Sequence, residues 1–125
     1  MLEEIVLFTG HVTDMPTVYN GLDVVVSAST SPEPQGMVGV ESMAMGRPVI
    51  GPNHGGAAEI MEHEKNGLLF EPGNAEDLAR VISQFYDSLV LRENLGKAAR
   101  EKVLETFAVE EHVRHVQKVY TEAFR

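Results

Sequence analysis

The 125-residue chain contains no cysteine. It therefore forms no disulfides, has no thiolate zinc site and uses no cysteine nucleophile, which fits a reducing compartment such as the cytoplasm. No apolar run approaches the ~20 residues that a membrane-spanning helix needs. The N-terminus also lacks a basic stretch leading into an apolar segment, so we expect no signal peptide.

Basic residues are scarce, above all in the first half of the chain. Ten Lys and Arg stand against 19 Asp and Glu, a net charge of −9. Residues 1–62 hold eight acids and a single base, Arg47, for a net charge of −7, whereas residues 63–125 carry −2. Without a basic patch, we expect neither a nucleic-acid partner nor binding to an anionic membrane surface. The content of 43% apolar and 23% charged residues is typical of one soluble globular domain.

Short apolar runs alternate with helical patterns along the chain. The runs predict strands at residues 5–8, 24–26, 48–50 and 68–70. The first two are continuously apolar, as in parallel strands buried on both faces. Helical patterns follow at 16–21 (opened by Asp14), 36–45, 57–63, after Asn74, from residue 91 and at 109–123. This alternation predicts an α/β fold with a parallel sheet flanked by helices.

The most informative stretch, residues 27–50, follows a predicted strand and opens a helix. Ligands of α/β sheets bind at the carboxyl ends of the strands, so this is a suitable place for a site. Gly36 lets the backbone approach a ligand closely, and the start of the helix offers free N–H groups that favour a phosphate. Glu33 lies in the loop and Glu41 about one turn into the helix, with seven residues between them. Carboxylates accept hydrogen bonds from hydroxyls, which suits ribose and sugar groups.

These residues resemble a known family, the retaining glycosyltransferases of the GT-B fold (glycosyltransferase family four, group 1). The resemblance rests on Glu33-x7-Glu41, on the run from Glu41 to Ile50 (ESMAMGRPVI), and on Gly55-Gly56-x-x-Glu59-Ile60. Segments 7–12, 21–24, 66–73 and 107–120 are similar to the family's strands and closing helix, so nearly the whole chain is covered. It implies a Rossmann-like parallel sheet, with residues 1–125 forming a partial C-terminal, nucleotide-sugar-binding domain. The N-terminal domain and the first strand–helix units of this domain would be absent.

The resemblance implies a group of residues that hold the sugar and diphosphate of the donor. Glu33 would be the catalytic residue and would bind hydroxyls of the donor sugar. Gly36, Met37 and Val38 would present backbone N–H groups to the donor sugar and diphosphate. The family usually has an aromatic residue where this chain has Gln35, which bears on the packing behind the loop or on the choice of sugar.

The same resemblance assigns the nucleoside to three other residues. Glu41 would bind the ribose hydroxyls, and His11 and Val12 would lie beside the base. The sequence shows no metal-binding motif, and the resemblance implies no cofactor and no required metal, because a helix N-terminus together with basic residues can replace one. The substrate would be a nucleotide diphosphate sugar.

The parent enzyme would transfer a sugar from this donor to an acceptor hydroxyl, with retention at the anomeric carbon. It would act with its N-terminal domain, in the cytoplasm or at the inner face of a membrane. We expect this chain alone to bind the donor weakly or not at all and to catalyse no transfer, because the basic residues that grip the diphosphate lie in the absent units. Two alternatives stay open: a non-catalytic nucleotide-sugar-binding or regulatory fragment acting with a separate acceptor-domain chain, and a GT-B-like sugar-nucleotide epimerase.

The strands that the resemblance implies to be absent would leave one edge of the sheet without its neighbouring strand. This open edge predicts rearranged local pairing, a swapped dimer with a second copy of the chain, or pairing with a partner fragment, because unpaired edges invite another strand. His54 is expected to be structural or exposed, and Gly55-Gly56 to be a turn. His112 and His115 are expected at the surface rather than at a metal.

Overall fold

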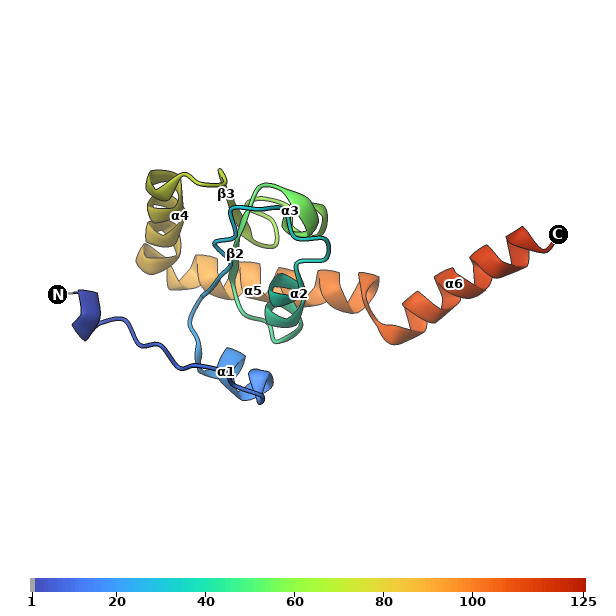
Figure 1. The fold of residues 1–125 in the computed structure, drawn as a ribbon, viewed down its shortest axis with the longest axis horizontal. Coiled ribbons are helices and arrows are strands. Elements are labelled where there is room, and N and C mark those ends of the chain that lie inside the picture. Colours follow the sequence, from blue (N-terminus) through green and yellow to red (C-terminus); the bar gives the residue numbers. More distant parts are fainter. Residues whose placement is uncertain (1) are drawn as a thin grey trace.

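The computed structural model describes residues 2–125, and Figure 1 shows their arrangement. Helices and strands alternate through the first two thirds of the chain, and three helices follow. In chain order the elements are η1 (Leu2–Glu4), α1 (Met15–Gly21), β1 (Val25–Val26), α2 (Met37–Ala44), β2 (Val49–Pro52), α3 (Gly55–Ile60), β3 (Leu68–Phe70), α4 (Ala75–Asp87), α5 (Leu89–Thr106) and α6 (Val109–Ala123). The predicted α/β class is confirmed.

The sheet is parallel, in the order β1-β2-β3. Val25 pairs with Val49, and Ile50 pairs with Leu68. Every residue of the central strand β2 is buried. Because all three strands run the same way, their carboxyl ends meet at one edge of the sheet, and the loops that leave this edge are placed side by side.

The core lies on both faces of this sheet. Successive strand residues point to opposite faces, and the neighbours Val49 and Ile50 accordingly belong to two different clusters. The cluster around Val49 contains Met43, Ile60, Met61, Ala99 and Val103. The cluster around Ile50 contains Leu68, Phe70, Val81, Phe85 and Leu95. Helix α5 contributes to both clusters. Because both faces of β2 are buried, this strand reads in the sequence as an uninterrupted apolar run.

The strand predicted at residues 5–8 is wrong. These residues form no ladder within the part of the chain that the structure describes, and Ile5 and Phe8 are 81% and 92% exposed. An apolar run becomes a strand only where another strand offers backbone partners, and Figure 1 shows this segment running toward α1 rather than along the sheet. Val26 is 40% exposed, so β1 is not buried on both faces as predicted, because it lies at the edge of the sheet.

Polar side chains cap the N-termini of α1 and α4, as the sequence predicts. Asp14 accepts a hydrogen bond from the Thr17 backbone N–H at 3.2 Å and starts α1. Asn74 accepts one from the Asp77 N–H at 3.0 Å and starts α4. Asp77 does not reach back to Asn74 as a capping box would; its carboxylate accepts from the Glu71 N–H at 2.8 Å. Helix α3 begins and ends earlier than the predicted range 57–63.

The last helix forms as predicted but lies apart from the core. Figure 1 shows α6 extending away from the sheet and from α4. Within residues 2–125 no side chain of α6 is buried, and its apolar positions Val109, Val113, Val116 and Tyr120 are all exposed. The amphipathic pattern therefore predicted the helix correctly, whereas none of the described residues covers its apolar face.

Strand β1 forms the edge of the sheet at which the absent strands would lie, and β3 forms the other edge. Among the described residues β1 pairs with β2 alone, so its other side offers unpaired N–H and C=O groups. Pairing of this edge with a second copy of the chain stays a prediction.

Helix α5 approaches the turn after α2 so closely that Gly96 has no room for a side chain. A Cβ at Gly96 would collide with the carbonyl oxygen of Gly46. We expect Gly96→Ala to lower the free energy of unfolding by about 1–3 kcal/mol, as overpacking does, even though alanine favours a helix. Urea unfolding followed by circular dichroism measures this. Gly21→Ala is the matched control, because nothing lies within 4 Å of a Cβ there; equal stabilities of the two variants would contradict the prediction.

Candidate functional site

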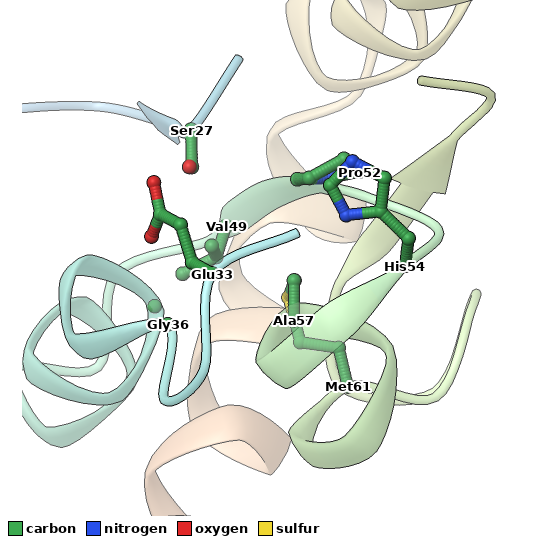
Figure 2. Close-up of a pocket in the computed structure, with 9 residues that line it drawn as sticks. Ser27, Glu33, Gly36, Val49, Pro52, His54, Ala57 and Met61 are labelled. Atoms are coloured by element: carbon green, nitrogen blue, oxygen red, sulfur yellow. The ribbon is translucent and has the colours of Figure 1, made fainter. Parts of the chain in front are cut away.

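A small pocket lies at the carboxyl edge of the sheet, between the loop after β1 and the start of α3. Figure 2 shows its lining residues, which come from β1's loop, α2, β2 and α3. They are Ser27, Glu33, Gly36, Gly39, Val49, Pro52, His54, Ala57 and Met61. The cavity volume is about 10 Å³, which is room for about one water molecule or one hydroxyl group.

The loop that carries Glu33 rests directly on the first turn of α3. The Gly56 N–H donates a hydrogen bond to the Glu33 carbonyl oxygen at 2.8 Å. A Cβ at Gly56 would lie 2.6 Å from the carbonyl carbon of Gln35 and 2.8 Å from the nitrogen of Gly36. The expected turn at Gly55-Gly56 is thus the start of a helix, and its lack of side chains lets two backbone segments touch.

Glu33 and Gly36 are brought together at the pocket. Figure 2 shows the Glu33 carboxylate pointing toward Ser27. Gly36 is buried with a φ of 58°, in the left-handed region that favours glycine, and it precedes α2 without any side-chain cap. The first N–H groups of a helix have no partner within the helix, so the first turn of α2, with Met37 and Val38 exposed, offers free donors beside Glu33.

Glu41 lies one turn further along α2 and is held by a tyrosine of α1. The Tyr19 hydroxyl donates a hydrogen bond to Oε2 of Glu41 at 2.8 Å. Tyr19 is 3% exposed, and burial, followed by the hydrogen bond and the negative charge of Glu41, raises the pKa of Tyr19 to about 12. Glu41 does not line the pocket of Glu33. Tyr19 could not be identified as its partner from local sequence patterns, because the two residues are 22 positions apart.

The two residues predicted beside the base are placed separately from this pocket. His11 and Val12 lie in the irregular segment before α1, with His11 exposed and Val12 half-buried. Neither lines the pocket of Glu33.

The surroundings of the pocket hold little positive charge. Arg47 is the single base among residues 1–62. Its guanidinium donates to the Leu22 carbonyl at 3.3 Å and to Asn20 Oδ1 at 3.4 Å, which ties the end of α1 to the turn after α2. Of the residues that line the pocket, His54 alone has a side chain that can carry a positive charge. In the part of the chain that the structure describes, no three His, Asp or Glu side chains are grouped so as to hold a metal ion.

His54, which is expected to be structural or exposed, is half-buried. Its ring lines the pocket and makes no hydrogen bond with the described residues. It precedes α3 without capping it. Its position at the carboxyl end of β2, directly before two glycines, was the signal available in the sequence.

No helix among the described residues combines the length and the apolar character that crossing a membrane requires.

The chain matches known proteins over most of its length. Residues 1–102 match the family model described as glycosyl transferases group 1. Over 124 residues the chain is 32% identical to N-acetyl-alpha-D-glucosaminyl L-malate synthase of Bacillus anthracis, covering 99% of this chain and 32% of that protein. The chain thus spans about a third of the length of the curated relatives it matches.

Solved structures show the same similarity. Anabaena HepE in complex with UDP superposes with a TM-score of 0.93 at 32% identity, over 97% of this chain and 33% of that one. Its complex with UDP-glucose gives a TM-score of 0.86 at 31% identity, over 92% and 32%. The C-terminal domain of a group 1 glycosyl transferase from Francisella tularensis gives 0.73 at 27% identity, over 83% and 53%.

The raised pKa of Tyr19 makes stability depend on pH in alkaline solution. In the unfolded chain a tyrosine ionises near its ordinary value of about 10, so between pH 10 and about 12 only the unfolded state loses this proton. The contribution of Tyr19 to the free energy of unfolding is therefore fully present below about pH 10 and is lost as the pH rises to about 12. We expect Tyr19→Phe to flatten this decline in urea unfolding measured across the pH range. Tyr86→Phe, an exposed control on α4, should keep the wild-type slope; equal slopes for both variants would refute the assignment.

Proposed function

The chain belongs to the glycosyl transferases group 1 family, and from this premise we propose that it forms the donor-binding part of a retaining GT-B glycosyltransferase. The whole protein would move a sugar from a nucleotide diphosphate sugar to an acceptor hydroxyl. Residues 1–125 would be a partial C-terminal domain of that protein. The observation that carries this proposal is the uncapped start of α2 beside Glu33, at the carboxyl edge of the sheet.

The first turn of α2 is assigned to the diphosphate. Gly36, Met37 and Val38 stand where backbone N–H groups and the positive end of the helix dipole face outward. During transfer the leaving diphosphate gains negative charge, and donors that are already oriented stabilise it without further rearrangement. Support comes from the relatives, since HepE, which shares this fold at a TM-score of 0.93, was solved with UDP.

The two glutamates are assigned to hydroxyl groups at opposite ends of the diphosphate. Glu33, in the loop, would accept hydrogen bonds from the donor sugar and act as the catalytic residue. Glu41 would accept them from the ribose: Tyr19 occupies its Oε2 and fixes the carboxylate, while Oε1 forms no hydrogen bond with the described residues. His11 and Val12 would lie beside the base.

Charge limits how tightly this chain alone can hold a diphosphate. Residues 1–62 carry a net charge of −7, and Arg47 is engaged with α1. Helix-dipole interactions are worth about 0.3–1 kcal/mol at exposed sites, too little to offset this repulsion. We therefore expect weak donor binding by the 125-residue chain, in the range that NMR titration detects, and assign transfer to the whole protein.

Substituting the two glutamates separates their proposed roles. UDP and UDP-glucose share the ribose, so Glu41→Gln should weaken both about tenfold or more, since hydrogen bonds to charged groups are worth about 1.5–3 kcal/mol. Glu33→Gln should weaken UDP-glucose and leave UDP unchanged. Chemical-shift titration of the chain with each ligand measures both.

Glu93→Gln, an exposed change on α5, serves as the control for altered net charge. Loss of UDP binding in the Glu33 variant, or unchanged binding in both variants, would contradict these roles.

A further inference from the structure

We propose that His54 is a further donor-binding residue, whose ring hydrogen-bonds a hydroxyl of the donor sugar from the side opposite Glu33 and so contributes to the choice of sugar. This inference rests on the proposed function and names a contact within the same site.

The first observation is that both ring nitrogens lack partners. Nδ1 and Nε2 of His54 are buried and form no hydrogen bond with the described residues. A neutral imidazole has one donor and one acceptor nitrogen. Buried polar groups are nearly always satisfied, so two orphaned atoms on one side chain require an explanation such as a bound molecule.

The second observation is where the ring lies. His54 lines the pocket together with Glu33 and Ser27. Figure 2 shows its ring on the wall opposite the Glu33 side chain. A role in starting α3 does not account for the residue, because its side chain makes no capping hydrogen bond.

The chemistry of the pocket favours a hydroxyl over a phosphate. A hydroxyl both donates and accepts hydrogen bonds and can satisfy either ring nitrogen, whereas a phosphate oxygen only accepts. The carboxylate of Glu33, which lines the same pocket, repels a phosphate and attracts a hydroxyl proton. The cavity of about 10 Å³ admits one group of that size, so a single hydroxyl of the sugar enters it while the rest of the donor stays outside.

Two substitutions and two ligands test the proposal on the 125-residue chain. His54→Leu keeps much of the volume and removes both polar atoms, and we expect it to weaken UDP-glucose about tenfold while UDP binds as in the wild type. His54→Gln retains a donor and an acceptor and should recover part of the affinity. His112→Leu, on the exposed helix α6, is the matched control.

A direct readout does not depend on how the variants fold. In the wild-type chain, the ring proton signals of His54 should move on addition of UDP-glucose and stay in place with UDP. Thermal unfolding of each variant records any change in stability alongside.

The outcomes distinguish this inference from the function beneath it. Suppose that both ligands bind the wild type, but that the His54 variants lose affinity for UDP and UDP-glucose equally or for neither. The ring then contacts only a buried water or forms part of the pocket wall, and the inference is overturned. If neither UDP nor UDP-glucose binds the wild type, the inference is overturned, and the proposed function fails with it only if GDP and ADP also leave the spectrum unchanged. A selective loss of UDP-glucose supports both.

Discussion

The contact between two stretches of bare backbone holds the candidate site together. The Gly56 N–H reaches the Glu33 carbonyl at 2.8 Å, and a single added carbon at Gly56 would intrude on Gln35 and Gly36. The loop that presents Glu33, the left-handed residue before α2 and the wall that carries His54 therefore share one support. Because α3 follows directly from the buried strand β2, this support is fixed to the most enclosed part of the sheet.

Much of the fold follows from local patterns in the sequence. The strands at β2 and β3, the caps at Asp14 and Asn74 and the course of α6 were predicted because each depends on apolar spacing or on a neighbouring side chain. The segment at 5–8 failed because a strand also needs a partner, which composition does not reveal. The start of α3 was predicted too late because its first residues are glycines, which read as a turn.

The candidate site, too, could be predicted from the sequence only in part. Glu33, Gly36 and Glu41 could be chosen from their spacing around a helix start, and the family they resemble is confirmed. Tyr19 and His54 could not be chosen in this way, because their contacts connect segments that are distant in the sequence. The Tyr19 hydroxyl donates to Glu41, 22 positions away. The His54 ring lines a cavity whose opposite wall comes from the loop of Glu33. The roles given to these side chains stay proposals, whereas their placement is a property of the structure.

The described residues form two regions of very different stability, the packed core and the helix α6. The core is closed by α5, whose Leu95, Ala99 and Val103 pack on both layers of the sheet, and none of the residues that form it comes from beyond residue 103. A helix without buried side chains is stabilised chiefly by its own backbone bonds, which are marginal at 15 residues. Its amide protons should therefore exchange with solvent through local fraying, long before those of β2, which are released only when the whole molecule opens.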